Sequence, residues 1–327
     1  MRAVVMQEFG GPQVLQARQV EDPVPGPGQV LVAVEYASVT FVETQMRSGR
    51  GPFGRPPLPR VPGNGVGGRV VRVGPGVDAG LMGSVVVTTT GGQGGYAELA
   101  LAQALDAIRV PDGLALQDAV ALLADGRTAL MLHRQAKPGP GEQVLVEAAG
   151  GGVGSLLTQL AAGAGARVIG AGRGLGKAEL VTSLGAAGYV DYSLPDWTDQ
   201  ADEATGRTGL DLVYDGVGGR IGTDAVRLLR DGGRVSIYGM ASGADAELDD
   251  EELAARSISV IGLSGAPSPD EARALITDAL TLAVEGTLRP VIGQTFPLAE
   301  ASAAHAAIEN RTTTGKTLLV AEASTRY

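Results

Sequence analysis

The segment Val144-Leu145-Val146-Glu147-Ala148-Ala149-Gly150-Gly151-Gly152-Val153-Gly154-Ser155-Leu156-Leu157 connects an apolar run to a helix-like run through a glycine-rich turn. Val144–Glu147 predicts a buried strand, and Ser155–Ala162 predicts a helix. Glycines at such a turn let the backbone approach a pyrophosphate, whose charge then lies at the positive end of the helix. A dinucleotide-binding turn is therefore expected, and the alternative is a strand–helix turn without a ligand. The expected contacts are Gly151, Gly152, Val153 and Gly154.

Two other stretches match the strict G-x-G-x-x-G spacing, Gly49–Gly54 and Gly63–Gly68. The first lies in a proline-rich loop, and the second runs into a strand predicted at Arg69–Val73. Neither follows a strand and opens a helix, so both are interpreted as chance matches in a chain with 50 glycines.

Strand and helix patterns alternate from about residue 116 to residue 262. Near-continuous apolar strands in such an alternation are typical of a doubly wound parallel sheet with helices on both faces. The first third instead reads as short strands separated by glycine- and proline-rich turns, and the residues after about 265 return partly to extended character. We therefore predict an α/β protein in which the chain's end completes the first domain.

The choice of cofactor depends on the end of the next predicted strand, Arg167–Ala171. A site for NAD would place Asp or Glu there to bind the ribose hydroxyls. The sequence has neither between Gly170 and Ala178, but it has Arg173 and Lys177. Two cations at this place suit a 2′-phosphate, which favours NADPH.

Composition excludes several other classes of protein. The 327 residues carry a net charge of −10, which opposes binding of nucleic acid phosphates. The absence of Cys excludes disulfides and thiolate metal sites, and two His residues are too few for a His-rich metal centre. No apolar run approaches a membrane span and the first residues lack a signal-peptide pattern, so a cytoplasmic protein is expected.

Short motifs spread over nearly the whole chain resemble the medium-chain dehydrogenase/reductase superfamily, in its zinc-free quinone oxidoreductase (zeta-crystallin-like) branch. Each motif is weak alone, but their order is specific. The motifs are Val42-Glu43-Thr44 with Arg47-Ser48-Gly49, Pro62-Gly63 with Gly68, Val73-Gly74-Pro75-Gly76-Val77, Gly94-Gly95-Tyr96-Ala97-Glu98, Val110-Pro111-Asp112-Gly113-Leu114, Gly126 with Thr128-Ala129, Gly151-Gly152-Val153-Gly154, Asp215 with Val217-Gly218-Gly219, and Gly315-Lys316.

The resemblance implies a GroES-like β-barrel catalytic domain at 1–123 and 265–327, and a Rossmann NADPH-binding domain at 124–264. It implies hydride transfer from NADPH to a small-molecule acceptor in the cleft where the domains meet. The composition argues against nucleic acid and membrane partners. It also implies a homodimer through the edge strand Ser257–Gly262. Further cofactor contacts implied by the resemblance are Thr128, Tyr192, Val217, Gly239, Met240 and Lys316.

Departures from the family pattern bear on the chemistry. Zinc members have Cys and His ligands in the barrel, whereas this chain has no Cys and neither His133 nor His305 falls at those positions, so no metal is expected. Many relatives have Tyr where Gln45 stands and Asn where Thr40 stands. Gln45 can donate a hydrogen bond but is no acid.

Some acceptors delocalise the negative charge that hydride addition leaves on them. Such acceptors can be reduced beside a weak proton donor. The sequence therefore favours quinones or other α,β-unsaturated carbonyls, with Gln45, Thr40 and Asn64 as substrate-facing residues unless they point elsewhere. One alternative is a stand-alone enoyl or enone reductase of secondary, polyketide-type metabolism. Another is an NADPH-binding structural or regulatory protein without turnover.

Overall fold

The computed structural model describes residues 1–52, 54–262 and 267–321, and within them the chain divides into two compact units. Unit 1 comprises Met1–Gly126 and the segment from Ala272 onward, and unit 2 comprises Arg127–Glu271. The expected domain boundary at 264/265 lies outside the described residues.

Unit 1 is built around a seven-stranded sheet in the order β14-β15-β3-β4-β5-β7, with β6 paired to β3 off this path. Its strands are β3 (Gln29–Val39), β4 (Gly65–Val73), β5 (Val85–Thr89), β6 (Leu99–Gln103), β7 (Ile108–Arg109), β14 (Ile292–Pro297) and β15 (Lys316–Val320). A separate hairpin-like pair is β1 (Arg2–Met6) and β2 (Leu15–Gln19). The helices are α1 (Phe41–Ser48), most of α8 (Pro269–Val284), and α9 (Ala301–Glu309).

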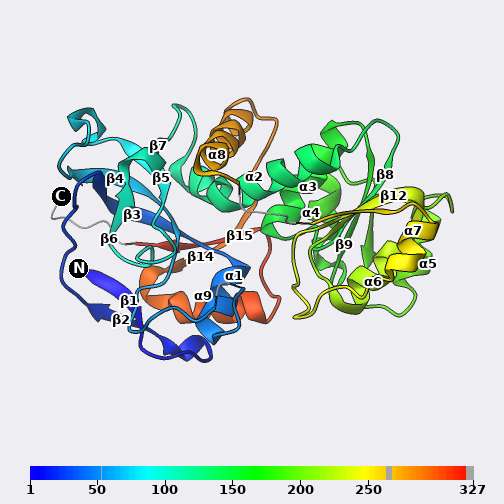
Figure 1. The fold of residues 1–327 in the computed structure, drawn as a ribbon, viewed down its shortest axis with the longest axis horizontal. Helices are drawn as coiled ribbons and strands as arrows, with labels where there is room; N and C mark the ends of the chain where they lie inside the picture. The colour runs from blue at the N-terminus through cyan, green and yellow to red at the C-terminus, as the bar shows by residue number, and fades with distance from the viewer. Residues whose placement is uncertain (53, 263–266, 322–327) are drawn as a thin grey trace. The chain divides into compact units, whose positions relative to one another are not determined.

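Strand β3 is central to unit 1, because it pairs with β4, β6 and β15. Its residues Val30, Leu31 and Val32 are fully buried, as expected for a strand segment covered on both faces. Figure 1 shows the C-terminal strands, in orange to red, beside β3 in blue, so both ends of the chain contribute to one sheet. The GroES-like, strand-rich class predicted for this part of the chain is confirmed.

Unit 2 contains a six-stranded parallel sheet in the order β10-β9-β8-β11-β12-β13, which confirms the doubly wound prediction. Figure 1 shows α3 and α4 on one side of this sheet and α5, α6 and α7 on the other. The strands are β8 (Gln143–Val146), β9 (Arg167–Gly172), β10 (Gly188–Asp191), β11 (Leu210–Asp215), β12 (Leu229–Ile237) and β13 (Ser259–Ile261). The helices are α3 (Gly152–Gly163), α4 (Ala178–Ser183), α5 (Trp197–Ala204), α6 (Gly219–Arg227) and α7 (Asp250–Ala255), and α2 (Leu116–Ala136) runs from unit 1 into unit 2.

The strand order of unit 2 reverses between β8 and β11. After β8 the chain adds β9 and β10 on one side, and it then returns to add β11, β12 and β13 on the other. In open α/β sheets, ligands bind outside the carboxyl ends of the strands at such a switch point.

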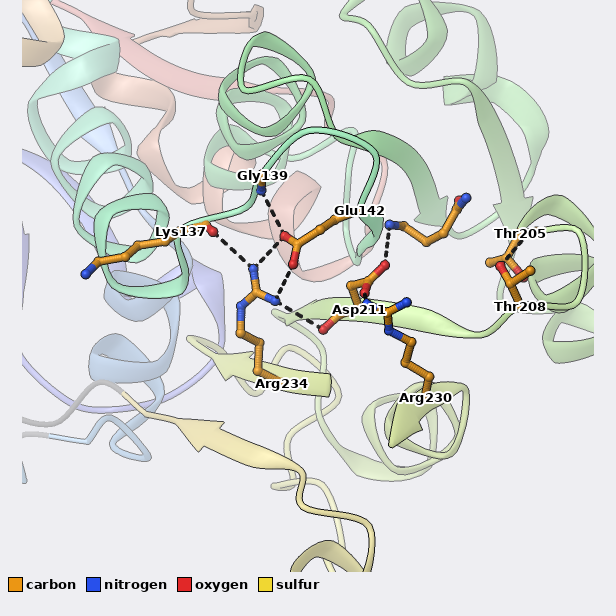
Figure 2. Close-up of polar contacts among 9 residues, drawn as sticks. Lys137, Gly139, Glu142, Thr205, Thr208, Asp211, Arg230 and Arg234 are labelled. Atoms are coloured by element: carbon orange, nitrogen blue, oxygen red, sulfur yellow. Dashed lines mark hydrogen bonds and ion pairs between the residues drawn. The ribbon is translucent and has the colours of Figure 1, made fainter. Parts of the chain in front are cut away.

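The amino ends of the same strands are closed by an ion-pair network around Arg234 (Figure 2). Its guanidinium donates to both carboxylate oxygens of Glu142, at 3.0 and 2.7 Å, and to the carbonyl of Lys137. Asp211 accepts from the backbone of Gln143 at 2.7 Å. These hydrogen bonds and ion pairs stabilise the unit. Because they lie at the end of the sheet opposite the glycine turn, they leave the switch point open.

The second glycine pattern, Gly63–Gly68, runs into β4 and opens no helix, as expected. A Cβ on Gly68 would lie 1.9 Å from the carbonyl oxygen of Ala33, so glycine is needed there for the close approach of β3. In the part of the chain that is described, no helix combines the length and the apolar character that a membrane crossing requires.

Candidate functional site

The glycine turn after β8 is shaped by backbone contacts that leave no room for side chains. Ala148 has a positive φ of 48°, and its carbonyl accepts from the amide of Gly151 at 2.7 Å. A Cβ on Gly154 would lie 2.3 Å from that same carbonyl oxygen. Helix α3 begins at Gly152, and its N-cap residue, Gly151, has no side chain to bind the first-turn amides. Those amides and the positive end of the helix are suited to a phosphate.

The two predicted phosphate-binding cations lie in the loop after β9. Arg173 is exposed, and Lys177 ends a short 3₁₀ turn, Leu175–Lys177. The methylenes of Lys177 pass over the glycine turn, since a Cβ on Gly150 would lie 2.6 Å from Lys177 Cδ. Lys177 is thereby placed beside the glycine turn, although the two are far apart in sequence.

Strand β10 holds this cation loop in place. Asp191 accepts from the amide of Gly174 at 2.8 Å, and the Tyr189 hydroxyl donates to the carbonyl of Gly174 at 2.9 Å. Burial would raise the pKa of Asp191, but hydrogen bonds from Ser193 and Gly174 and the charge of Arg173 together lower it. Asp191 is thus an ionised neighbour of Arg173 that sequence reasoning missed, because it comes from the next strand.

The other predicted cofactor residues of unit 2 follow the same strand ends. Val217 follows β11, and Gly239 and Met240 follow β12. A Cβ on Gly239 would lie 2.6 Å from the carbonyl oxygen of Gly216, so the two turns touch through backbone. Tyr192 directly follows β10, where its amide donates to Gly172 at 3.0 Å, and Thr128 lies within α2.

In unit 1, three predicted site residues gather around a residue that was not predicted, Glu43. Its Oε2 accepts from the amide of Thr40 at 2.8 Å, and its Oε1 accepts from the amide of Asn64 at 2.9 Å. The charge of Lys316 also acts on this carboxylate. Lys316 is 3% exposed, and its ammonium lies 3.0 Å from Asp125 Oδ1 on α2.

A buried chain of hydrogen bonds extends from Glu43 through Tyr96 to His305. The Tyr96 hydroxyl donates to Glu43 at 3.0 Å and lies 3.0 Å from His305 Nε2. Because the hydroxyl proton is directed to Glu43, Nε2 carries the proton that the hydroxyl oxygen accepts. Burial, together with the charge of Arg47, lowers the pKa of His305 to about 3, so the imidazole is neutral.

Burial raises the pKa of Glu43 above its usual value, because its effect outweighs those of the Thr40 and Asn64 backbone, the charge of Lys316 and the Tyr96 hydroxyl, which lower it. The two carboxylate oxygens receive three donors and offer none, which favours the ionised form at neutral pH. Burial and the Glu43 charge raise the pKa of Tyr96 well above its usual range, so its hydroxyl stays protonated.

The three predicted substrate-facing residues have different surroundings. Thr40 is the N-cap of α1, where its hydroxyl accepts from the amide of Glu43 and keeps its own proton for donation. Asn64 uses its Oδ1 to accept from the amides of Thr90 and Gly92, at 3.3 and 2.7 Å. Gln45 lies half-buried in α1, and its carbonyl accepts from Ser48 Oγ and the amide of Arg50.

One of the missed residues did leave a signal in the sequence. Thr40-x-x-Glu43 is a capping-box pattern, and both of its reciprocal hydrogen bonds are present. Tyr96 and His305 left no local signal, since they meet Glu43 and each other only through the fold.

A zinc site does not fit these residues. The chain has no Cys, and within residues 1–52, 54–262 and 267–321 no group of three or more His, Asp or Glu side chains is arranged to hold a metal ion. A thiolate-based zinc site of the dehydrogenase type therefore has no ligands in this sequence.

Two family models match the chain: the alcohol dehydrogenase GroES-like domain at residues 26–112 and the zinc-binding dehydrogenase at residues 152–280. A 2-haloacrylate reductase from Burkholderia sp is 35% identical over 98% of this chain and 99% of the relative. A quinone oxidoreductase from Rattus norvegicus is 35% identical over 93% of each chain. The crystal structure of Escherichia coli quinone oxidoreductase complexed with NADPH has a TM-score of 0.88 at 29% identity and covers 98% of this chain and 100% of that one.

Proposed function

From the membership of this chain in the zinc-free quinone oxidoreductase branch of the medium-chain dehydrogenase/reductase superfamily, we infer that it is an NADPH-dependent reductase of conjugated carbonyl compounds. We propose that it transfers a hydride to a quinone or another α,β-unsaturated carbonyl without zinc. The observation that carries the proposal is the glycine turn beside two cations at the switch point of unit 2.

The residues at this turn fit NADPH. The side-chain-free surface at Gly151 and Gly154 lets a pyrophosphate approach the first-turn amides of α3. Arg173 and Lys177 supply the charge for a 2′-phosphate, and Asp191 fixes their loop through Gly174. When bound, NADPH supplies the hydride, and the protein supplies binding, orientation and a dry environment.

Unit 1 supplies the groups proposed to face the acceptor. Gln45 and the Thr40 hydroxyl are neutral donors, which orient a carbonyl oxygen without protonating it. A quinone or an enone delocalises the charge left by hydride addition, so its proton can come from solvent. A simple ketone would leave an alkoxide that needs a metal or an acid, and Gln45 and Thr40 are neither.

Reduction of an activated carbon–carbon double bond is a second candidate within the same chemistry. It is favoured by the relative named as a 2-haloacrylate reductase, whose named substrate carries a conjugated double bond. A stand-alone enoyl or enone reductase would use the same donors for the enolate oxygen. A protein that binds NADPH without turnover is the third outcome of the test.

The test is NADPH consumption with a panel of quinones, enones, acrylates and simple ketones, with and without a metal chelator. Conjugated acceptors should turn over equally in both conditions, and simple ketones should not turn over. Turnover of ketones or loss of activity with the chelator would contradict the proposal. Tight NADPH binding without any turnover would favour the binding-protein alternative.

The cofactor assignment has its own test. The variant combines Arg173→Ala with Lys177→Gln, which keeps most of the side-chain stem that covers Gly150. NADPH binding should weaken about 100-fold, because each lost charged contact costs about 1.5 kcal/mol. NADH binding should change less than about threefold. Arg167→Ala, at the opposite end of β9, is the matched control and should leave both affinities unchanged. Equal losses for NADPH and NADH would contradict the phosphate assignment.

We also propose a homodimer through β13. This strand is the edge of the unit 2 sheet, and Ser259 and Val260 on it are exposed, Val260 at 47%. An unpaired edge with an exposed apolar side chain is suited to pairing with a second copy across a two-fold axis. Light scattering should give the mass of a dimer for the wild type and of a monomer for Val260→Lys.

A further inference from the structure

Two buried carboxyl groups lie side by side at the switch point of unit 2. Glu147 directly follows β8 and Asp215 ends β11, and these strands are neighbours in the sheet. Both side chains are 0% exposed. Both accept from one backbone amide, that of Val217, at 3.1 Å for Glu147 Oε2 and 2.9 Å for Asp215 Oδ1.

The second oxygen of each carboxyl group has no hydrogen-bond donor in the described structure. Glu147 Oε1 and Asp215 Oδ2 are both buried and without a partner. Asp215 Oδ2 occupies the space beside Gly222 of α6, where a Cβ would lie 2.4 Å from it. Asp215 Oδ1 has a second donor, the amide of Gly218, at 2.7 Å.

Two carboxylates that share one donor in a dry site cannot both stay ionised without a large cost. A single proton between them removes the repulsion and gives one unpartnered oxygen a donor, as in other carboxyl pairs that share a proton. Asp215 Oδ1 accepts from the amides of Val217 and Gly218 at 2.9 and 2.7 Å, closer than the 3.1 Å from the Val217 amide to Glu147 Oε2, so the proton belongs on Glu147. In agreement, burial and the charge of Asp215 raise the pKa of Glu147 well above its usual range.

The other titratable groups near the pair are three tyrosines, Tyr238 after β12, Tyr192 after β10 and Tyr214 on β11. Tyr238, just after β12, donates its hydroxyl to the carbonyl of Glu147 at 3.2 Å. Burial and the charges of Glu147 and Asp215 raise the pKa of Tyr238 well above its usual range, and Tyr192 and Tyr214 act in the same direction. Tyr238 therefore remains neutral and supplies no counter-charge to the pair.

The pair connects the two turns that border the proposed cofactor site. Glu147 is joined to Ala148, the first residue of the glycine turn, and both carboxyl groups hold the amide of Val217. The turn at Val217 also binds the segment after β12, because the Val217 carbonyl accepts from the amide of Ser242 at 2.8 Å. A change in the separation of the carboxyl groups would therefore move the backbone on both sides of the site.

We propose that Glu147 and Asp215 share one proton and act as a positioning pair, which holds the glycine turn after β8 in register with the turn after β11 for nucleotide binding. Glu147 is a positioning residue, because it acts through the two turns. The inference rests on the proposed function only where it concerns the nucleotide.

The test compares Glu147→Gln, Glu147→Ala and the wild type in the full chain, with Glu251→Gln as an exposed control in the same unit. Gln keeps a neutral donor and acceptor but cannot titrate, whereas Ala removes both. NADPH affinity should stay within about threefold of wild type for Glu147→Gln and fall at least about tenfold for Glu147→Ala. Equal losses in the two variants would overturn the positioning role.

Two measurements test the shared proton without NADPH. Infrared difference spectra at pH 7.5 should show a protonated carboxyl band in the wild type and in Glu251→Gln, but not in Glu147→Gln. Folding should bind a proton, because the pKa of Glu147 is raised, so the wild-type folding constant should fall with rising pH by up to about tenfold per unit more than that of Glu147→Gln.

Absence of the wild-type band, or equal pH slopes for wild type and Glu147→Gln, would overturn the shared proton. Absence of the band in the wild type overturns the shared proton even if the variants fail to fold. If wild-type protein binds no NADPH, the proposed function fails, and the band and the pH slope still decide the protonation state.

Discussion

Substitution of Gly154 by Ala tests the dinucleotide turn most directly. The added methyl carbon would lie 2.3 Å from the carbonyl oxygen of Ala148 and 2.9 Å from its carbonyl carbon. Both obstacles are backbone atoms, and the same carbonyl accepts from the amide of Gly151 at 2.7 Å. The turn must therefore shift, and that hydrogen bond must lengthen.

The expected cost can be worked out from these contacts. Overpacking costs about 1–3 kcal/mol, and a weakened hydrogen bond adds about 1 kcal/mol. Replacing glycine in a helix returns about 0.5–1 kcal/mol, so Gly154→Ala should lower the free energy of unfolding by about 1–3 kcal/mol. Because the first-turn amides of α3 move with the turn, NADPH affinity should fall about tenfold or more.

Gly163→Ala at the other end of α3 is the matched control, since no atom lies within 4 Å of its Cβ position. It should leave NADPH affinity unchanged and raise the free energy of unfolding by up to about 1 kcal/mol. Urea unfolding and fluorescence titration with NADPH measure both quantities. The reasoning is refuted if Gly154→Ala binds NADPH as tightly as wild type, or if Gly163→Ala is equally damaging.

Three further substitutions test the hydrogen bonds around the two sites. Tyr96→Phe should lower the free energy of unfolding by about 2–3 kcal/mol in urea unfolding, because it leaves buried groups of Glu43 and His305 without partners; an unchanged midpoint would contradict the buried chain. The pKa of His305 is lowered to about 3, so the unfolded chain binds a proton more readily than the folded one. The wild-type free energy of unfolding should therefore fall as pH decreases from 6.5 toward 3, by up to about 1.4 kcal/mol per pH unit. His305→Gln should lose that pH dependence in the same assay. Asp191→Ala should weaken NADPH, but not NADH, about fivefold in titrations, because the amide of Gly174 loses its acceptor; an equal effect on both nucleotides would show that the loop does not serve the phosphate.

The sequence predicted the features that depend on neighbouring residues. The glycine turn, its strand and its helix lie within about 20 residues, so the apolar run and the glycines predict them together. The parallel sheet follows from the alternation of strands and helices for the same reason. Arg173 and Lys177 were identified as a pair because they follow one strand.

The features that were missed depend on contacts between distant residues. Tyr96 lies 53 residues from Glu43 and 209 residues from His305, so no local pattern connects them. Asp191 reaches Gly174 from a neighbouring strand, and a search for an acid at the end of β9 alone does not find it. Thr40 was chosen because it stands where many relatives have Asn, whereas its spacing to Glu43 indicates a helix cap.

The placement of β15 has a consequence for biosynthesis. This strand lies between β14 and β3 and comes from the last part of the described chain. Until β15 is made, the edge of β3 that it will pair with, from Tyr36 to Val39, has no partner strand. Nascent chains that stop between residues 271 and 316 should therefore aggregate or recruit chaperones, although unit 2 is already complete in them.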